Sequence, residues 1–126
     1  MPTLSVLPET LAICRLNANE AIPAWAMNGE FVAITRTLDE LSIVCAAENV
    51  VPDVKADRGW RVLKVAGPLD LTLTGVLASL AKPLAEAKIN IFTVSTFDTD
   101  YLLVKGHNLE RACDVLRQAG HVVAGA

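Results

Sequence analysis

From residue 61 to the C-terminus, the spacing of the apolar residues changes in an order that few folds can accommodate. Runs rich in β-branched and aromatic residues predict four strands, at 61–66, 89–97, 101–105 and 121–123. Between them, apolar residues recur every three or four positions over 73–87 and 109–116, which predicts two amphipathic helices. The order strand, helix, strand, strand, helix, strand is typical of a ferredoxin-like unit, an antiparallel sheet with both helices on one face.

The ends of the two predicted helices carry recognisable signals. Thr72 or Thr74 can cap the start of the first helix, and Pro83 should kink it because proline removes a backbone hydrogen bond. Asn108 can cap the start of the second helix, and Gly120 is expected to end it.

The first 55 residues repeat this pattern in a thinner form. Strand-like runs lie at 10–16, 31–37 and 41–47, with a short segment around 22–27 and no second long helix. Asp39 and Glu40 separate the second and third runs at hairpin spacing. The stretch 48–60 contains Pro52 and Gly59 and is interpreted as a junction. We therefore predict an α+β protein of two fused ferredoxin-like (βαββαβ) modules with antiparallel sheets. The first module is abbreviated and covers residues 1–58, and the second covers 59–126.

Composition and charge exclude several classes of protein. The net charge is −3 and the eleven Lys and Arg residues are scattered, which argues against a nucleic-acid-binding surface. The N-terminus has no basic start, and no stretch of about 18 apolar residues occurs, so neither a signal peptide nor a membrane span is expected. Cys14, Cys45 and Cys113 are odd in number and widely spaced, which favours reduced, buried thiols. We predict a cytoplasmic protein.

No convincing catalytic set is present. The only histidines, His107 and His121, have no evident nucleophile beside them, and the cysteines lie in apolar runs that make thiols inert. The pair Asp98 and Asp100 is better explained as turn-forming residues than as a cation site. We therefore predict no catalytic residue, no metal and no cofactor, and a protein that is not an enzyme. An enzyme using Cys14 or Cys45 is the least favoured alternative.

The segment 67–75 (GPLDLTLTG) leads from a predicted strand into a predicted helix. Unpaired amide groups and the positive end of the helix dipole make such a helix start a cradle for a carboxylate. Asp70 adds one negative charge that can pair with an ammonium group, so an amino acid is the simplest ligand that satisfies both. The alternative, which this segment alone favours, is that Asp70 and Thr72 only cap the helix.

The segment 95–101 (STFDTDY) connects the two middle strands of the second module. We expect this hairpin to lie at the opposite end of the module from the 67–75 loop. Thr96, Phe97 and Asp100 would then meet the loop of a neighbouring module. The alternative is an ordinary turn in which Phe97 is a packing residue.

The run GPLDLTLTGVLASLAKPLAEAKINIFTVSTFDTDYLLVKGHNLERA closely resembles the ACT-domain family, in particular small bacterial tandem ACT proteins related to the cytosolic arginine sensor of TOR signalling. The piece STFDTDYLLV is the most specific, and FVAITRT with DELSIVC resembles the preceding module. The resemblance implies that a free amino acid binds in the seam between paired ACT modules. The ligand-binding residues that it implies are Asp70, Leu71, Leu73 and Thr74 from the loop, Asn90 and Ile91 from the next strand, and Thr96, Phe97 and Asp100 closing the pocket.

The resemblance also bears on specificity and assembly. In the arginine sensor the loop carries an acidic residue where this chain has Leu73, and that sensor has four modules where this chain has two. With one complete set of loop and strand, a shared seam requires two chains, so we expect a homodimer with two equivalent sites. A regulatory amino-acid sensor without an attached enzyme would report to a downstream protein. The alternative function is a structural or interaction subunit of the same fold that binds no ligand.

Overall fold

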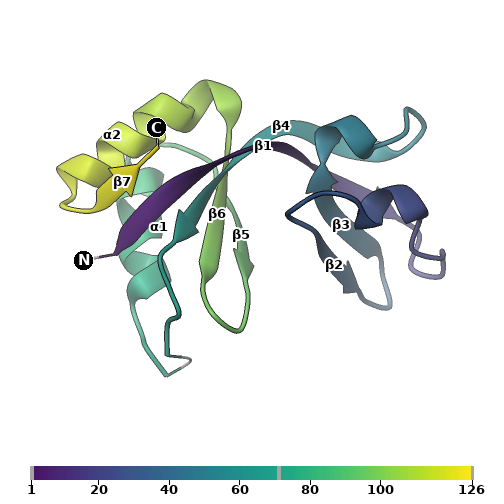
Figure 1. Ribbon diagram of the computed structural model, residues 1–126, viewed down its shortest axis with the longest axis horizontal. Coiled ribbons are helices and arrows are strands. Elements are labelled where there is room, and N and C mark those ends of the chain that lie inside the picture. The colour runs from purple at the N-terminus through teal and green to yellow at the C-terminus, as the bar shows by residue number, and fades with distance from the viewer. Residues whose placement is uncertain (1, 71, 126) are drawn as a thin grey trace. The chain divides into compact units, whose positions relative to one another are not determined.

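The computed structural model describes residues 2–70 and 72–125 and contains nine regular elements (Figure 1). The strands are β1 (Thr3–Leu16), β2 (Ala33–Arg36), β3 (Leu41–Ala46), β4 (Lys55–Val65), β5 (Phe92–Ser95), β6 (Asp100–Lys105) and β7 (Val122–Ala124), and the helices are α1 (Val76–Glu86) and α2 (Leu109–Gln118). Short 3₁₀ turns occupy Ala24–Met27, Ala47–Asn49 and Gly106–Asn108. Neither helix in the described part of the chain is long and apolar enough to cross a membrane.

The chain divides into two compact units, and the division differs from the one expected over residues 1–8. The larger unit comprises the residues up to Pro8 and those from Arg61 onward, and the smaller unit comprises Glu9–Trp60. The start of β1 joins the larger unit because Thr3 pairs with Val122 of β7, and the amide of Ala66 donates to the carbonyl of Thr3 at 2.7 Å. The stretch 48–60, interpreted as a junction, ends at the boundary between the two units, and its second half is part of β4, which begins at Lys55.

The larger unit follows the predicted element order, β4, α1, β5, β6, α2, β7. Its strands are arranged as β7-β1-β4-β6-β5, so the start of β1 lies between the last strand and β4. β5 pairs antiparallel with β6, whereas β7 pairs parallel with β1. The unit is therefore a mixed α+β structure with a largely antiparallel sheet. The parallel β1–β7 pair was not expected, because it depends on an N-terminal segment far away in the sequence.

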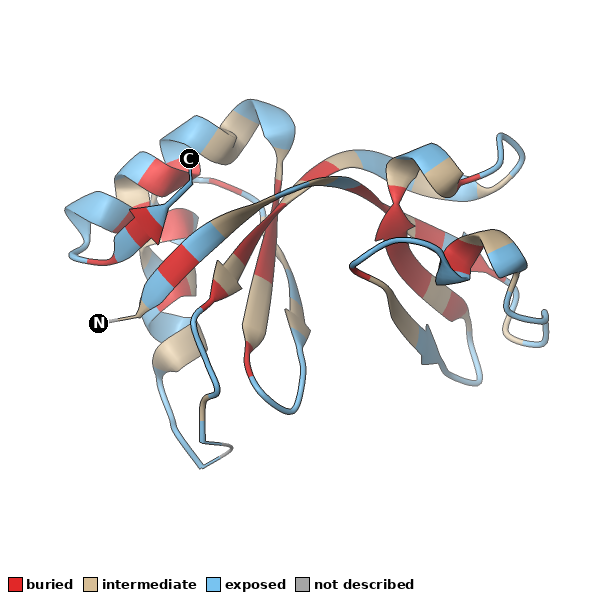
Figure 2. Ribbon diagram, viewed as in Figure 1, coloured by how far each residue is buried: buried red, intermediate tan, exposed pale blue. Residues whose placement is uncertain are grey.

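Both helices pack on the same face of this sheet. Alternate residues of β4 and β6 share one apolar cluster with the buried stripes of the helices (Figure 2). The fully buried members of that cluster are Leu4, Leu63, Val65, Leu80, Leu84, Leu102, Val104, Ala112, Cys113 and Leu116. Their spacing of two on strands and of three or four on helices is the periodicity that the sequence shows.

In the smaller unit, β3 pairs antiparallel with both β2 and β1. The predicted hairpin at residues 37–40 is confirmed: the hydroxyl of Thr37 accepts from the amides of Asp39 and Glu40, at 3.1 and 3.2 Å. The core is built from alternate residues of β1 and β3 together with Ala26 of the first 3₁₀ turn. Two of these alternate residues are Cys14 and Cys45.

The helix ends agree only in part with the predictions. Gly120, with φ of 97°, follows α2, and the amide of His121 donates to the carbonyl of Leu116 at 3.0 Å, so α2 ends as expected. Neither Thr72 nor Asn108 caps a helix through its side chain. Residue Gly75 occupies the N-cap of α1 with φ of 81°, a conformation that glycine adopts without strain.

Pro83 lies inside α1 and removes the amide that would bond to the carbonyl of Ser79. The ring atom Nε2 of His121 lies 3.2 Å from that carbonyl oxygen, and His121 is only 4% exposed. In this part-buried contact, His121 takes the place of the hydrogen bond that Pro83 cannot make. This contact ties the C-terminal segment to the first half of α1.

The ends of β4 and β5 lie at the same edge of the larger unit, which contradicts the expectation that their loops are at opposite ends. A helix that packs back across the sheet returns the chain to the edge where β4 began, so β5 runs in the same direction as β4. The amide of Leu69 donates to the carbonyl of Asp98 at 2.6 Å. The hydroxyl of Thr99, which is 4% exposed, donates to the carbonyl of Val65, also at 2.6 Å. The loop after β4 and the β5–β6 hairpin are therefore joined directly.

Replacing His121 should cost stability in a way that depends on Pro83. We expect His121→Leu to lower the free energy of unfolding by about 0.5–1.5 kcal/mol, because the Ser79 carbonyl loses its partner. In a Pro83→Ala background the new amide can bond to Ser79, so the same change should cost less. Urea denaturation of the four proteins measures this coupling. If the two changes in the free energy of unfolding simply add, the His121 bond does not take the place of the missing Pro83 bond.

Replacing Thr99 should loosen the junction between the loop and the hairpin. Thr99→Val keeps the shape of the side chain but removes the hydroxyl, and it should lower the free energy of unfolding by about 1–3 kcal/mol. Thr93→Val is the matched control, because Thr93 is an exposed residue of β5. Equal stability of the two variants in thermal or urea denaturation would show that the Thr99 hydroxyl does not hold the junction.

Candidate ligand-binding site

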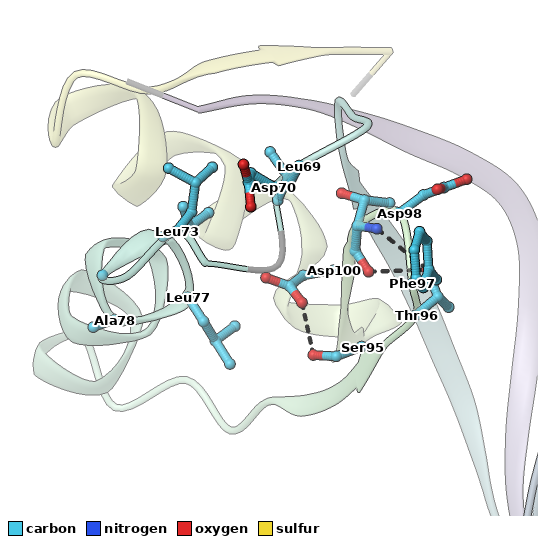
Figure 3. A pocket seen from close by; sticks show the side chains of 13 residues that line it. Leu69, Asp70, Leu73, Leu77, Ala78, Ser95, Thr96, Phe97, Asp98 and Asp100 are labelled. Atoms are coloured by element: carbon cyan, nitrogen blue, oxygen red, sulfur yellow. Dashed lines mark hydrogen bonds between the residues drawn. The ribbon is translucent and has the colours of Figure 1, made fainter.

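A pocket of about 280 Å³ opens where the β4–α1 loop meets the β5–β6 hairpin (Figure 3). Its first wall is formed by Leu69, Asp70, Leu73 and Gly75 of the loop and by the first turn of α1. All six residues of the hairpin segment 95–100 form the second wall. The volume lies near the lower end of the range for small-molecule sites, about 300–1,000 Å³, and so suits a small metabolite.

Three Asp residues line the pocket, and its described lining residues include no Lys, Arg or His side chain. Asp70 comes from the loop, and Asp98 and Asp100 come from the hairpin. Figure 3 shows the Asp70 and Asp100 carboxylates beside the space between the hairpin and α1, whereas the Asp98 side chain is turned away from it. Because two like charges beside one small volume repel each other, the site favours a ligand that carries positive charge.

The Asp70 carboxylate is held in a tight turn at the edge of the pocket. Its Oδ1 atom accepts hydrogen bonds from the amide and from the hydroxyl of Thr72, both at 2.8 Å. These bonds, the backbone bond first, lower the pKa of Asp70 below its ordinary value, so the group is a carboxylate at neutral pH. Asp70 and Thr72 thus bond to each other and form a turn, and they do not cap α1.

The start of α1 brings positive electrostatic potential to the first wall of the pocket. The first bond within the helix runs from the amide of Ser79 to the carbonyl of Gly75 at 2.9 Å. The amides of Val76, Leu77 and Ala78 precede that bond, and these three residues line the pocket. Amides at a helix start attract anions, a carboxylate included. The pocket therefore presents both a negative and a positive region.

The hairpin is closed by Thr96 and Thr99. The amide and the hydroxyl of Thr96 donate to the carbonyl of Thr99 at 2.8 and 3.1 Å. At the tip, Phe97 is 78% exposed, and across the pocket Leu73 is 55% exposed. The alternative interpretation of Phe97 as an ordinary packing residue was therefore wrong. Two large apolar side chains instead border the pocket.

Five of the nine predicted site residues line this pocket: Asp70, Leu73, Thr96, Phe97 and Asp100. Thr74 is exposed and does not line it, and Leu71 lies outside the described residues. Asn90 and Ile91 precede β5, so they lie at the other end of that strand from the hairpin. Ile91 packs against the core of the larger unit.

Several lining residues, chiefly Ser95, Asp98 and the first turn of α1, are not among those predicted from the sequence. The signal for Ser95 and Asp98 was present in the run STFDTDY, which contains both. The direction of the strands in a strand–helix–strand connection would have placed that run beside the 67–75 loop of its own module.

Other groups of chemical interest are structural. Burial, followed by the neighbouring thiol of Cys45, raises the pKa of Cys14 to about 11, so its thiol is protonated at neutral pH. Burial likewise raises the pKa values of Cys45 and Cys113. Within residues 2–70 and 72–125, no group of three His, Cys, Asp or Glu side chains is placed to hold a metal ion.

The chain is similar to proteins that bear on this site. A crystal structure of a protein from Agobacterium tumefaciens is 48% identical, has a TM-score of 0.92, and covers 97% of this chain and 91% of its own. The human protein named cytosolic arginine sensor for mTORC1 subunit 1 is 35% identical over 60 residues, which are 47% of this chain and 18% of that protein. This chain therefore matches a small part of the sensor.

A lower similarity shows the fold alone. The regulatory subunit of aspartate kinase from Thermus thermophilus is 10% identical and has a TM-score of 0.65, and the match covers 92% of this chain and 96% of that one. Two family models also match the chain: one described as an N-terminal domain over residues 9–53, and one described as the ACT domain over residues 55–118. Because the second covers about half of the sequence, this protein belongs to the ACT-domain family.

Proposed function

We propose that this protein is a regulatory sensor, not an enzyme, that binds a free amino acid in the pocket between the β4–α1 loop and the β5–β6 hairpin. One observation carries the proposal: the same small pocket contains the amide end of α1 and the carboxylates of Asp70 and Asp100. A zwitterion requires that combination of opposite charges. Membership of the ACT family and the similarity to a named arginine sensor support the proposal.

The proposed pose follows the charges. The ligand carboxylate approaches the amides of the first turn of α1, where the helix dipole favours it. The ligand ammonium pairs with Asp70, whose carboxylate is already held by Thr72. Asp100 receives a positive group of the ligand side chain, and Leu73 and Phe97 cover its apolar part. Leu71 and Thr74 belong to the same loop and are proposed to contribute backbone groups.

The site is proposed to be completed at a seam with a second ACT module, so that Asn90 and Ile91 of a neighbouring module close over the ligand. The exposure of Phe97 and Leu73 at the pocket border supports this, because a ligand held there is still open to water. A homodimer provides two such seams. We further propose that the liganded dimer acts in the cytoplasm by binding a downstream protein.

Ligand binding should be visible as thermal stabilisation. A ligand that binds only the folded state at one hundred times its Kd adds about 2.7 kcal/mol of stability, which raises Tm by several degrees. In a screen of the twenty amino acids, we expect at least one to raise Tm of the unmodified protein. Asp70→Ala and Asp100→Ala should abolish that shift and still unfold cooperatively, because neither residue is buried.

Asp53→Ala is the matched control, because Asp53 is an exposed carboxylate of the smaller unit, far from the pocket in sequence. It should keep the full shift. If no amino acid stabilises the unmodified protein, the amino-acid sensor is rejected in favour of an ACT subunit that binds no ligand.

The proposed seam makes assembly and binding interdependent. Sedimentation velocity should show a dimer, and the proposed amino acid should shift any monomer present toward dimer, because the ligand contacts both chains. If the protein is purely monomeric and still binds the amino acid, the shared seam is rejected. The pocket within one unit would then be the whole site.

A further inference from the structure

Ser95 and Asp100 form a side-chain pair inside the pocket. They are directly opposed in the register of β5 and β6, at the hairpin end of the ladder. The hydroxyl of Ser95 donates to Oδ1 of Asp100 at 2.6 Å. That distance is typical of a hydrogen bond from a hydroxyl to a charged carboxylate, about 2.5–2.7 Å.

This bond is not needed to close the hairpin. The turn is already held by the amide and hydroxyl of Thr96, which donate to the carbonyl of Thr99, and by the return bond from the amide of Thr99 to the hydroxyl of Thr96 at 3.3 Å. Thr99 is also anchored to the carbonyl of Val65. Within the described part of the chain, the Ser95 hydroxyl donates to the Asp100 carboxylate and takes no part in the bonds between Thr96 and Thr99.

The bond leaves one oxygen of Asp100 available to a ligand. In Figure 3, Oδ1 is turned toward Ser95 along the dashed line, and the second oxygen is turned toward the space between the hairpin and α1. The terminal torsion of an aspartate is broad, so without Ser95 the carboxylate would sample many orientations. Fixing it in advance removes an ordering cost that the ligand would otherwise meet.

We propose that Ser95 is a positioning residue: it fixes the Asp100 carboxylate so that the pocket distinguishes ligands by a positive charge on their side chain. The proposal rests on the amino-acid-binding function proposed above. It makes the Ser95–Asp100 pair a determinant of specificity, whereas Asp70 and the start of α1 recognise the groups that all amino acids share. Loss of Ser95 should weaken cationic ligands and leave their neutral isosteres almost unaffected.

Two pairs of probes separate charge from shape: L-lysine against L-norleucine, and L-arginine against L-citrulline. Calorimetric titration of the full chain gives the ratio of affinities within each pair. We expect the unmodified protein to prefer the cationic member by at least about tenfold, and Asp100→Asn to abolish that preference. Ser95→Ala should reduce the ratio by about three- to tenfold, as one lost hydrogen bond predicts, with Tm of the free protein nearly unchanged.

Two further variants test the role of the hydroxyl. Ser95→Thr retains it and suits a strand, so this variant should keep the unmodified ratio. Thr93 lies on the same strand as Ser95, is exposed and does not line the pocket. Thr93→Ala should therefore leave the ratio of affinities unchanged as well.

The outcomes separate this inference from the proposed function. If amino acids bind but the ratio is equal to one, or is the same in Ser95→Ala as in the unmodified protein, the positioning role is rejected and the sensor function stands. If Ser95→Ala weakens all four probes equally, Ser95 is merely structural and the inference is again rejected. If the unmodified protein binds no amino acid, the proposed function itself fails, and this inference fails with it.

Discussion

The junction between the β4–α1 loop and the β5–β6 hairpin is the constraint on which the candidate site depends. Two short hydrogen bonds make it, from the amide of Leu69 to the carbonyl of Asp98 and from the hydroxyl of Thr99 to the carbonyl of Val65. The space there is also limited at Gly67, where a Cβ atom would lie 2.9 Å from the carbonyl oxygen of Asp98. Any larger residue would push the loop away from the hairpin, and the pocket exists only because the two approach this closely.

The chemistry of the pocket follows from what each wall can supply. A helix start supplies positive potential without a basic side chain, so carboxylates can surround the same volume without being neutralised by the protein. Thr72 and Ser95 each donate to one of those carboxylates and hold it in place. Such prearranged groups reduce the ordering cost of binding, which matters for a ligand as small as an amino acid. The exposed Phe97 and Leu73 leave the apolar covering incomplete within one unit.

Local patterns predicted most of the elements because their causes are local. The apolar stripe of α1 and the Gly120 stop of α2 depend on residues within one or two turns, and both are found in the structure. The predicted hairpins at residues 37–40 and 95–100 likewise depend on neighbouring residues. The unpredicted features involve distant segments. β1 begins at Thr3 because β7 pairs with it, and His121 bonds to Ser79 because Pro83 cannot.

The sequence by itself determined the order of the elements, because periodicity is a property of short segments. Its resemblance to the ACT family predicted five of the residues that line the pocket. Only the tertiary structure decided that the loop and the hairpin meet within one unit. It also decided that Asn90 and Ile91 lie at the far end of β5, and that Ser95 holds Asp100. The physical reason is that the direction of β5 is set by the return of α1 across the sheet, and that the Ser95–Asp100 contact depends on the register in which β5 pairs with β6. Neither can be read from the spacing of residues along a single segment.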